Sequence, residues 1–406
     1  MLAVFVVSIG YGVLLPLLPY LIERLVGAGV EAAQVSRHTG LLTAVYTLSL
    51  FVFAPLWGRL SDRRGPRGVL FVGLLGFGVT MLVFSFVESL AAVYAERFLS
   101  GVFAAAVAPV AAGVVGQFTT TEEVRARRLA FLGMASIAGF LLGPTLGVSV
   151  TRFAADFLTR AMPAGSVALP LAATALLAFL MACAVAFSVP SGTAADRPPE
   201  HPGDTIVKTG RLVPRLLILS FIVSAGIGVF EVGLALRGRQ ELGLAPYQIA
   251  LMFTDCSVVM FVVQAIVFSP WIKPATTRWL LVPALSVLAV GLLLVPRASS
   301  FTSMLVVIGA VAASAGTLSP ILTYWISAKA GNAQGWELGK QTAATNLGVT
   351  TGSAIGGLLF NIIALPGASF MFAALLAVFG FVLSLKLPHL LVPRDLGMSV
   401  SASKVP

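Results

Sequence analysis

Four ionisable residues lie inside long apolar stretches of the sequence: Glu96, Arg97, Glu231 and Asp255. Burial of a charged group within a membrane-length apolar segment costs free energy, so such groups are found there mainly where they have a function. At the rise of an α-helix, Arg97, Glu231 and Asp255 fall at a similar depth, roughly 8–12 Å from one end of their segments. Three acids beside one base leave an excess of negative charge. Such a layer can bind protons, a cationic substrate, or both.

Simpler interpretations exist for part of this set. Glu96 and Arg97 are adjacent in the sequence and could pair with each other. Glu231 could reach water beside Arg237. Asp255 is the hardest to explain as a structural residue, because most of its neighbours in the sequence are apolar.

We expect segment 58–67 to be a short loop between two membrane-length apolar stretches. It concentrates charge in ten residues, and its candidate functional residues are Gly58, Asp62, Arg63, Gly65 and Arg67. Asp62 needs a positive partner, which Arg63, Arg67 or the N-terminus of a neighbouring helix could supply. The arginines could also serve only to anchor the chain at lipid phosphates.

A second group of special residues is Gly139, Gly143, Pro144 and Gly147. The three glycines recur every four residues, so they share one helix face and allow another backbone to approach closely. Pro144 removes a backbone hydrogen bond and is expected to bend the helix. Ordinary packing of small residues would explain the glycines equally well.

The composition of the chain indicates whether the segments that carry these residues lie in water or in lipid. The chain has 406 residues, of which 58% are apolar and 10% charged, and its mean hydropathy is +0.98. Soluble domains carry about 25% charged residues, so this composition indicates a membrane protein. The net charge of +10 comes from arginines in short loops rather than along one face, which argues against nucleic-acid binding.

Nothing in the sequence predicts an enzyme, a metal site or a bound cofactor. Cys183 and Cys256 are far apart in apolar stretches, and the three histidines, His38, His201 and His389, lie at helix ends or in loops. We find no phosphate-binding glycine loop and no arrangement typical of a catalytic triad. The missing ATP-binding motif argues against ATP-driven transport, so we expect a transmembrane proton gradient to be the driving force of any transport by this chain.

Apolar runs of about 20 residues predict twelve membrane spans. The expected fold is all-α, with twelve transmembrane helices in two pseudo-symmetric six-helix bundles. The predicted boundaries are an N-terminal bundle over 1–189, a cytoplasmic linker over 190–212, a C-terminal bundle over 213–390 and a cytoplasmic tail over 391–406. The first apolar run begins at once, so we expect no removable signal peptide.

Loop charges predict the orientation. With both termini in the cytoplasm, the cytoplasmic loops and tail hold 18 Lys and Arg residues and the opposite loops hold 7. This bias agrees with the positive-inside rule and predicts a multi-pass protein of a bacterial-type inner membrane.

The two halves also share a pattern. Gly139, Gly143 and Gly147 in the fifth span are each followed by a glycine 209 residues later, at Gly348, Gly352 and Gly356. Such agreement indicates duplication of a six-helix unit. Duplicated bundles are typical of transporters that rock about a site at the interface of their halves.

These motifs resemble the major facilitator superfamily over essentially the whole chain. Segment 58–67 is similar to its signature G-x-L-a-D-r-x-G-r-r, except that Pro66 replaces a basic residue. The fifth span is similar to the antiporter signature G-x-x-x-G-P-x-x-G-G, except for Val148. Arg97 is similar to the arginine of the fourth-span motif, and the first span, from Gly10 to Pro19, resembles those of the 12-span multidrug efflux branch. The resemblance implies that Asp62 latches the cytoplasmic side by joining the halves, and that the fifth-span motif favours export.

The sequence therefore predicts a secondary transporter, which exports a small amphipathic or drug-like compound in exchange for protons and works as a monomer in contact with membrane lipid. One alternative is a proton symporter or facilitator that imports a solute, and another is a transport-inactive receptor or assembly protein on the same scaffold. Many proton-driven exporters that it resembles carry an acid within the first span, where this chain has none before Glu23. Tyr46, Gln264 and Asn346 are the candidate cavity residues. They belong to a wider set of polar and aromatic residues in the central spans, with Tyr11, Tyr324, Trp325 and Asn361.

Overall fold

The computed structural model of the chain describes residues 1–27, 31–117, 122–157, 168–189, 212–267, 269, 272, 274–329, 334–362 and 364–391. Regular structure within these ranges is helical, without strands. The helices of the first part are α1 (Leu2–Leu14), η1 (Leu15–Leu17), α2 (Leu18–Val26), α3 (Ala32–Arg64), α4 (Pro66–Phe84), α5 (Leu90–Ala104), α6 (Val107–Gln117), α7 (Glu122–Phe157) and α8 (Ala168–Ser188).

The second part repeats this pattern of long helices joined by short turns. Its helices are α9 (Leu212–Leu236), the π-helical turn η3 (Arg237–Glu241), α10 (Pro246–Val267), η4 (Pro274–Leu280), α11 (Leu281–Leu294), η5 (Val295–Arg297), α12 (Phe301–Lys329), α13 (Gln334–Leu359), α14 (Ala368–Ser384) and α15 (Leu387–Leu390).

The helices form the expected number of membrane crossings in the described part of the chain. Nine helical segments are long and apolar enough to span a membrane, and two shorter apolar helices lie within α7 and α14. The remaining long helix is α13, with 26 residues. The described helices thus agree with the expected all-α fold of twelve spans.

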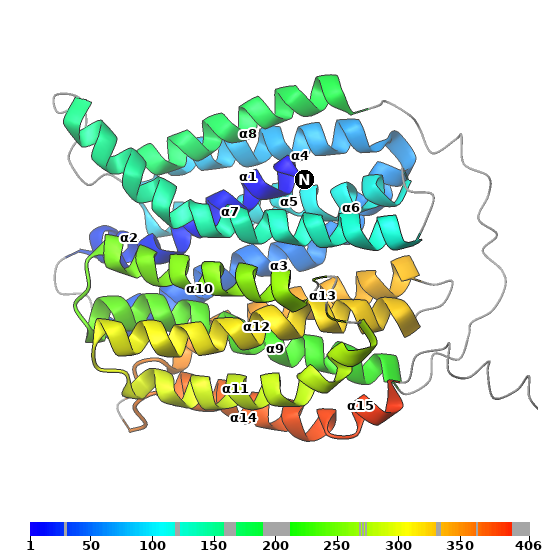
Figure 1. Cartoon of the computed structure of the whole chain (residues 1–406). Coiled ribbons are helices and arrows are strands. Elements are labelled where there is room, and N and C mark those ends of the chain that lie inside the picture. Colours follow the sequence, from blue (N-terminus) through cyan, green and yellow to red (C-terminus); the bar gives the residue numbers. More distant parts are fainter. Residues whose placement is uncertain are drawn as a thin grey trace, which may run out of the picture.

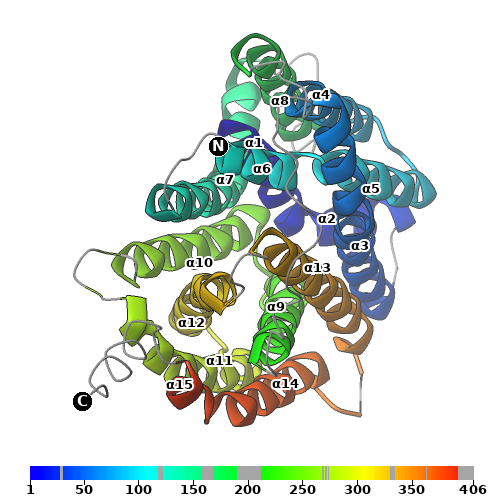
Figure 2. The same ribbon diagram turned by 90° about the vertical axis from the view of Figure 1, so that its right-hand side faces the viewer.

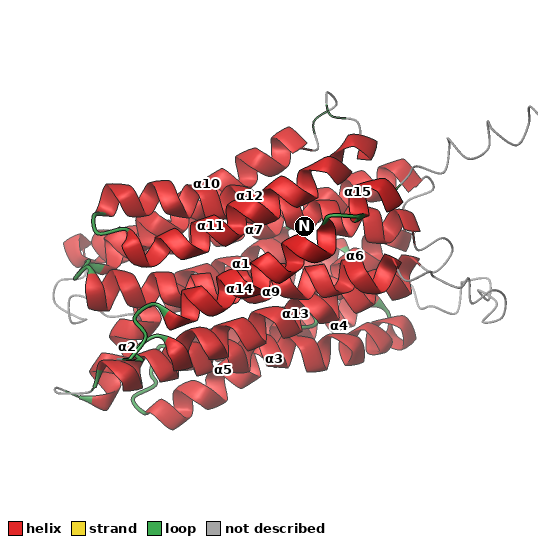
Figure 3. Cartoon of the chain, turned by 90° about the horizontal axis from the view of Figure 1, so that it is seen from below, coloured by secondary structure: helices red, strands yellow, loops and turns green. Residues whose placement is uncertain are grey.

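The spans run side by side in two groups (Figure 1). Helices α1–α8 form the upper group in this view and α9–α15 the lower group. Viewed from the end, α3 lies beside α13 and α7 lies beside α10 (Figure 2), and both pairs are in contact. Figure 3 shows the same helices from below, joined by short loops. The interface between the groups is therefore built mainly by these two helix pairs.

Glycines create equivalent close contacts in both groups. A Cβ atom added to Gly12 of α1 would lie 2.7 Å from the Phe140 carbonyl oxygen of α7. A Cβ on Gly228 of α9 would lie 2.6 Å from the Val349 carbonyl oxygen of α13. Phe140 and Val349 differ by the same 209 positions as the glycine pairs in the sequence. The pairs α1–α7 and α9–α13 therefore have matching helix contacts, as duplication of one unit predicts.

The fifth-span motif sits at this contact. Added Cβ atoms on Gly139 and Gly143 would collide with α1, at the carbonyl oxygens of Phe5 and Ile9 respectively. Helix α7 continues through Pro144, which lies in its interior. Gly139 and Gly143 therefore allow the close approach of α1 that the sequence predicts. Gly147 does not, because a Cβ there would lie 3.5 Å from the nearest Val13 side-chain atom, an ordinary contact distance.

The charged segment 58–67 is a helix end rather than a loop, which corrects the sequence-based interpretation. Helix α3 continues to Arg64, Gly65 adopts a positive φ of 86°, and α4 starts directly at Pro66. Gly65 tolerates this conformation because it lacks a Cβ, and proline suits the first turn of a helix. Gly58 and Asp62 therefore lie on the last turns of α3. The side chain of Asp62 lies outside the described residues, so its role as a latch stays a prediction.

Two predicted boundaries also fall outside the described ranges. The linker 190–212 is outside them except for Leu212, which begins α9, and the tail 391–406 is outside them except for Leu391. The proposed limits of the two bundles therefore stay predictions.

Candidate functional site

A cavity of about 390 Å³ lies between the two groups of helices. Its walls come from α1, α3, α5, α6 and α7 on one side and from α9, α10, α12 and α13 on the other. Most of the lining is aliphatic or aromatic. Its polar lining residues are Ser8, Tyr11, Tyr46, Thr47, Ser136, Glu231, Cys256, Ser257 and Asn346. A mostly apolar pocket with a few convergent polar groups is typical of a small-molecule site.

Glu231 of α9 supplies the carboxyl group among these lining residues. The Tyr11 hydroxyl of α1 donates a hydrogen bond of 2.8 Å to Glu231 Oε2. The bond joins residues from the two groups of helices across the cavity. Glu231 thus lines the pocket and is not paired with Arg237. Arg237 instead pairs with Glu241 and donates to two carbonyl oxygens of the α11–α12 connection.

Aromatic rings surround this hydrogen bond. The Tyr11 ring stacks on that of Tyr46, with centroids 5.4 Å apart and an interplanar angle of 18°. Phe140 lies on another side of Tyr11, at 5.7 Å, and also contacts Phe253 of α10 at 6.1 Å. The cavity thus combines a carboxyl group with flat apolar surfaces. That combination suits a lipophilic cation, because aromatic faces also attract positive charge.

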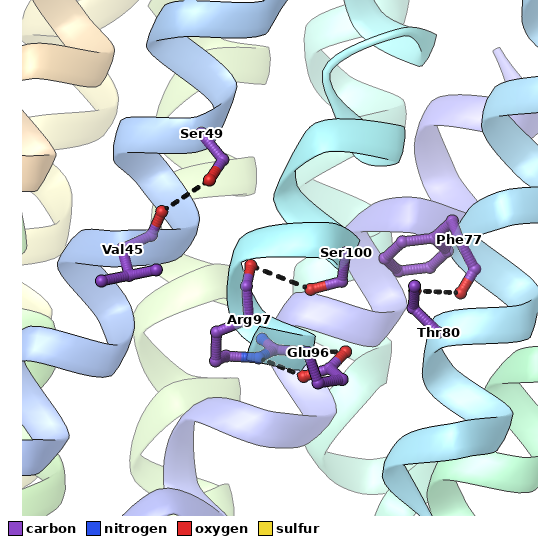
Figure 4. A network of polar contacts seen from close by, with 7 residues as sticks. All are labelled: Val45, Ser49, Phe77, Thr80, Glu96, Arg97 and Ser100. Carbon is purple, nitrogen blue, oxygen red and sulfur yellow. Dashed lines mark hydrogen bonds and ion pairs between the residues drawn. The ribbon is translucent and has the colours of Figure 1, made fainter. Parts of the chain in front are cut away.

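Glu96 and Arg97 form a buried ion pair on α5 (Figure 4). Arg97 Nε lies 2.8 Å from Glu96 Oε2, and Arg97 Nη2 lies 3.1 Å from Glu96 Oε1. Both side chains are only 3% exposed, and neither lines the cavity. The local pairing considered as the simpler interpretation is therefore correct. The similar depth of Arg97, Glu231 and Asp255 would permit pairing across the halves, but among the described contacts Arg97 pairs with Glu96.

Asp255 does not face the cavity, which corrects its grouping with Glu231. The lining residues of α10 include Phe253 and Cys256, whereas Asp255 shares its helix face with Leu251, Val258 and Val262. Those three side chains are 47%, 43% and 47% exposed, as expected for a lipid-facing surface. The Oδ2 atom of Asp255 is buried and has no hydrogen-bond partner among the described residues.

The three candidate cavity residues have different outcomes. Tyr46 and Asn346 line the cavity, whereas Gln264 does not. Gln264 lies on the cavity face of α10, but one turn beyond Met260, where the lining ends. Two small polar contacts were not anticipated: Ser8 with Ser136, at 2.8 Å, and Thr47 with Thr350, at 2.9 Å. Hydroxyl groups on membrane helices are common, so the sequence offered little signal for either pair.

One end of the bundle, here called the Glu23 end, is closed by polar contacts between the two groups of helices. Arg239 of η3 donates to both carboxylate oxygens of Glu23 on α2, at 2.7–3.1 Å. Its guanidinium lies 4.6 Å from the centre of the Tyr20 ring, and the Tyr20 hydroxyl donates to the Leu244 carbonyl oxygen. Sequence reasoning missed this cluster because the partners are more than 200 residues apart.

A second set of contacts reinforces the Glu23 end. Asn361, which follows the C-terminal end of α13, donates to Ser36 of α3 at 2.5 Å and to Gln240 of η3 at 2.9 Å. One turn along the same helices, a Cβ added to Gly40 would lie 2.7 Å from the Gly357 Cα atom, so the two backbones are in direct contact. Helices α3 and α13 therefore meet without intervening side chains.

The opposite end, here called the Arg63 end, carries the N-terminus and the junction of α3 and α4. Arg63 and Arg64 are exposed there, and a Cβ added to Gly58 would have open space around it. Arg67 is half-buried near the start of α4.

Comparison with known proteins agrees with this arrangement. Multidrug resistance protein 2 of Bacillus subtilis is 25% identical over 395 residues, covering 94% of this chain and 92% of that protein. Multidrug resistance protein 1 of the same organism is 27% identical over 369 residues, covering 88% of each chain. Quinolone resistance protein NorA of Staphylococcus aureus is 24% identical over 362 residues, covering 88% of each chain.

A solved structure shares the fold. The human organic anion transporter MFSD10 (TETRAN) superimposes with a TM-score of 0.67 at 21% sequence identity, covering 94% of this chain and 97% of that one. The family model of the Major Facilitator Superfamily matches residues 1–336. With this match over most of its length and with the twelve-helix fold, the chain belongs to the Major Facilitator Superfamily of membrane transporters.

Proposed function

We propose that this protein is a proton-coupled exporter of lipophilic, positively charged small molecules, which works by alternating access. The observation that carries the proposal is Glu231, a carboxyl group within an apolar, aromatic cavity between two similar groups of helices. A carboxylate can hold either a proton or a cation, but not both. Exchange of one for the other at this group would couple export to the proton gradient.

The direction and orientation of transport rest on two supports. The multidrug and quinolone resistance proteins that resemble this chain are named for resistance, which a membrane transporter would provide by removing a compound from the cell. The excess of loop Lys and Arg supports an orientation with the Arg63 end on the cytoplasmic side of a bacterial-type inner membrane. The Glu23 end would then face outward. The cavity is built by one chain, which supports action as a monomer.

The residues have distinct roles in this proposal. Glu231 carries the proton or the cation, and Tyr46, Phe140 and Phe253 provide apolar contact surface for the substrate. Asn346 offers an amide for hydrogen bonding. Asp62 would latch the Arg63 end when the Glu23 end opens.

Inside-out membrane vesicles test both the coupling and the direction. An acid-inside gradient is established by respiration and followed with a pH-sensitive dye, and ethidium is then added as a planar lipophilic cation. We expect ethidium to release part of the gradient in vesicles with the wild-type protein, because it enters in exchange for protons.

Two variants provide the contrast. Glu231→Gln should abolish the proton release, whereas Asp255→Asn, which removes an acid on the lipid-facing side of α10, should retain it. Proton release that Glu231→Gln leaves intact would exclude Glu231 as the coupling group. If a panel of lipophilic cations gave no release while neutral solutes acidified or alkalinised the vesicles, the importer alternative would replace the proposal.

A further inference from the structure

A continuous series of contacts leads from Glu231 into the interior of the first group of helices. Glu231 accepts from Tyr11 at 2.8 Å, and Tyr11 stacks on Tyr46 at 5.4 Å. The Arg97 guanidinium lies 5.2 Å from the centre of the Tyr46 ring. Glu96 holds Arg97 with two hydrogen bonds. The series joins the cavity carboxyl to a buried ion pair that does not touch the cavity.

Close helix packing fixes the position of the middle of this series. A Cβ added to Gly101 of α5 would lie 2.6 Å from the Tyr46 carbonyl oxygen and 2.7 Å from the Ser49 Cβ atom. Helix α5 therefore contacts the backbone of α3 at Tyr46, one turn from Arg97. Phe84 of α4 also contacts Arg97: its ring centre lies 5.1 Å from the Arg97 guanidinium. Arg97 thus has little freedom to move away from Tyr46.

We propose that Tyr46 and the Glu96–Arg97 pair are positioning residues that hold the Tyr11 hydroxyl on Glu231. In this account the ion pair fixes Tyr46, Tyr46 fixes the ring of Tyr11 by stacking, and Tyr11 donates to the Glu231 carboxylate. The hydrogen bond from Tyr11 thereby competes with a substrate cation for the Glu231 carboxylate. The inference rests on the proposed role of Glu231, and it assigns Arg97 an indirect role instead of contact with substrate or proton.

The arrangement has a consequence for pH dependence. A hydrogen bond donated to a carboxylate stabilises its ionised form, so loss of the Tyr11 hydroxyl should make Glu231 bind its proton at higher pH. The other titratable groups of the cavity lining are Tyr46 and Cys256. Neither changes charge in the range where a carboxyl titrates, so the shift can be assigned to the lost hydrogen bond.

Infrared titration of the purified protein tests this without any substrate. The C=O stretching band of protonated Glu231 is identified as the band that Glu231→Gln removes, and its intensity is followed with pH. We expect Tyr11→Phe to move the midpoint toward alkaline pH by about one unit, as loss of one hydrogen bond to a charged group implies. Tyr46→Leu should move it in the same direction by a smaller amount, whereas Tyr46→Phe, which keeps the ring, should leave it unchanged.

A double-mutant comparison separates positioning from independent effects. The paired variant Glu96→Gln with Arg97→Gln removes the ion pair without changing the net charge, so it should act only through Tyr46. It should shift the midpoint in the wild-type background and add nothing in the Tyr11→Phe background. Full additivity, or an unmoved midpoint in either Tyr11→Phe or Tyr46→Leu, would overturn the inference. A normal titration pattern in protein that transports no cation would leave the positioning intact and refute the export function instead.

Discussion

The two ends of the bundle differ in how the two groups of helices meet. At the Glu23 end, Arg239, Gln240 and Asn361 reach across to α2 and α3, and the backbones of α3 and α13 touch at Gly40 and Gly357. At the Arg63 end, by contrast, Arg63 and Arg64 are exposed and a Cβ added to Gly58 would have open space around it. The contacts of the Glu23 end show that this end is closed, and they are the contacts that must break there during transport.

The composition of the two ends also differs. At the Glu23 end the groups are joined by the Arg239–Glu23 ion pair and by neutral hydrogen bonds, whereas the Arg63 end concentrates arginines and Asp62 on the last turns of α3. Reversible closure at both ends needs contacts of comparable strength, since a conformational equilibrium shifts only by differences in free energy. The arginine-rich end of α3 carries charge that would supply such contacts at the Arg63 end.

The largest expected effect comes from blocking closure at the Glu23 end. Gly40→Leu would place a side chain where Gly357 Cα lies 2.7 Å from an added Cβ, so α3 and α13 could not meet. We expect transport of ethidium to fall more than tenfold at unchanged membrane abundance. Gly113→Leu is the matched control, because a Cβ there has open space. Equal activity of the two variants would show that the contact at Gly40 is not needed.

The predicted latch at the Arg63 end should have the next largest effect. Asp62→Asn removes the carboxylate and keeps the shape, and a hydrogen bond to a charged group contributes about 1.5–3 kcal/mol. We therefore expect about a tenfold loss of transport, measured per molecule inserted in the membrane. Undiminished transport by Asp62→Asn would contradict a latch role for Asp62, and the arginines would then serve only as anchors.

A smaller effect is expected from the ion pair at the Glu23 end. The side chains of Arg239 and Glu23 are 37% and 28% exposed, and exposed pairs contribute about 0–1 kcal/mol. Glu23→Arg alone should lower transport about two- to fivefold, because it sets two like charges against each other. The exchanged pair Glu23→Arg with Arg239→Glu should recover most of the lost transport. If the exchanged pair were no better than the single variant, attraction between these two residues would not contribute to closure.

The smallest effect is expected at the lipid-facing acid. Asp255→Asn should change ethidium transport less than twofold and leave its pH dependence unmoved, since the side chain does not line the cavity. The same assay on Glu231→Gln provides the comparison. A loss of proton coupling in Asp255→Asn would place the coupling group on the outside of α10.

The helices and their duplication were predictable because both depend on patterns along the chain. Apolar runs of membrane length identify spans directly, and the spacing of Gly139 and Gly348 reappears as matched contacts of α7 with α1 and of α13 with α9. The charged segment near Asp62 was located correctly but interpreted as a loop. Its helical form depends on Gly65, whose positive φ allows α3 to continue to Arg64.

The direction in which a side chain points was the harder problem. Counting residues along each helix predicted that Asp255 and Glu231 lie at a similar depth in the membrane. It did not predict in which direction around the helix the Asp255 side chain points. In water an apolar stripe would reveal the buried face, whereas in lipid both faces of a helix are apolar and the sequence carries little record of which one lines a cavity. Contacts between distant residues, such as Tyr11 with Glu231 and Glu23 with Arg239, were beyond reach for the same reason.

The central claim, that the two groups of helices tilt about the cavity and open its ends in turn, can be tested by measuring two distances in one protein. Spin labels are placed at Arg24 and Tyr247 for the Glu23 end, or at Arg64 and Ala328 for the Arg63 end, with Cys183 and Cys256 replaced by serine. When pH is lowered in the presence of ethidium, we expect a population with a longer Arg24–Tyr247 distance, matched by an equal population with a shorter Arg64–Ala328 distance. Distances that lengthen together, or that do not change at either end, would contradict the account.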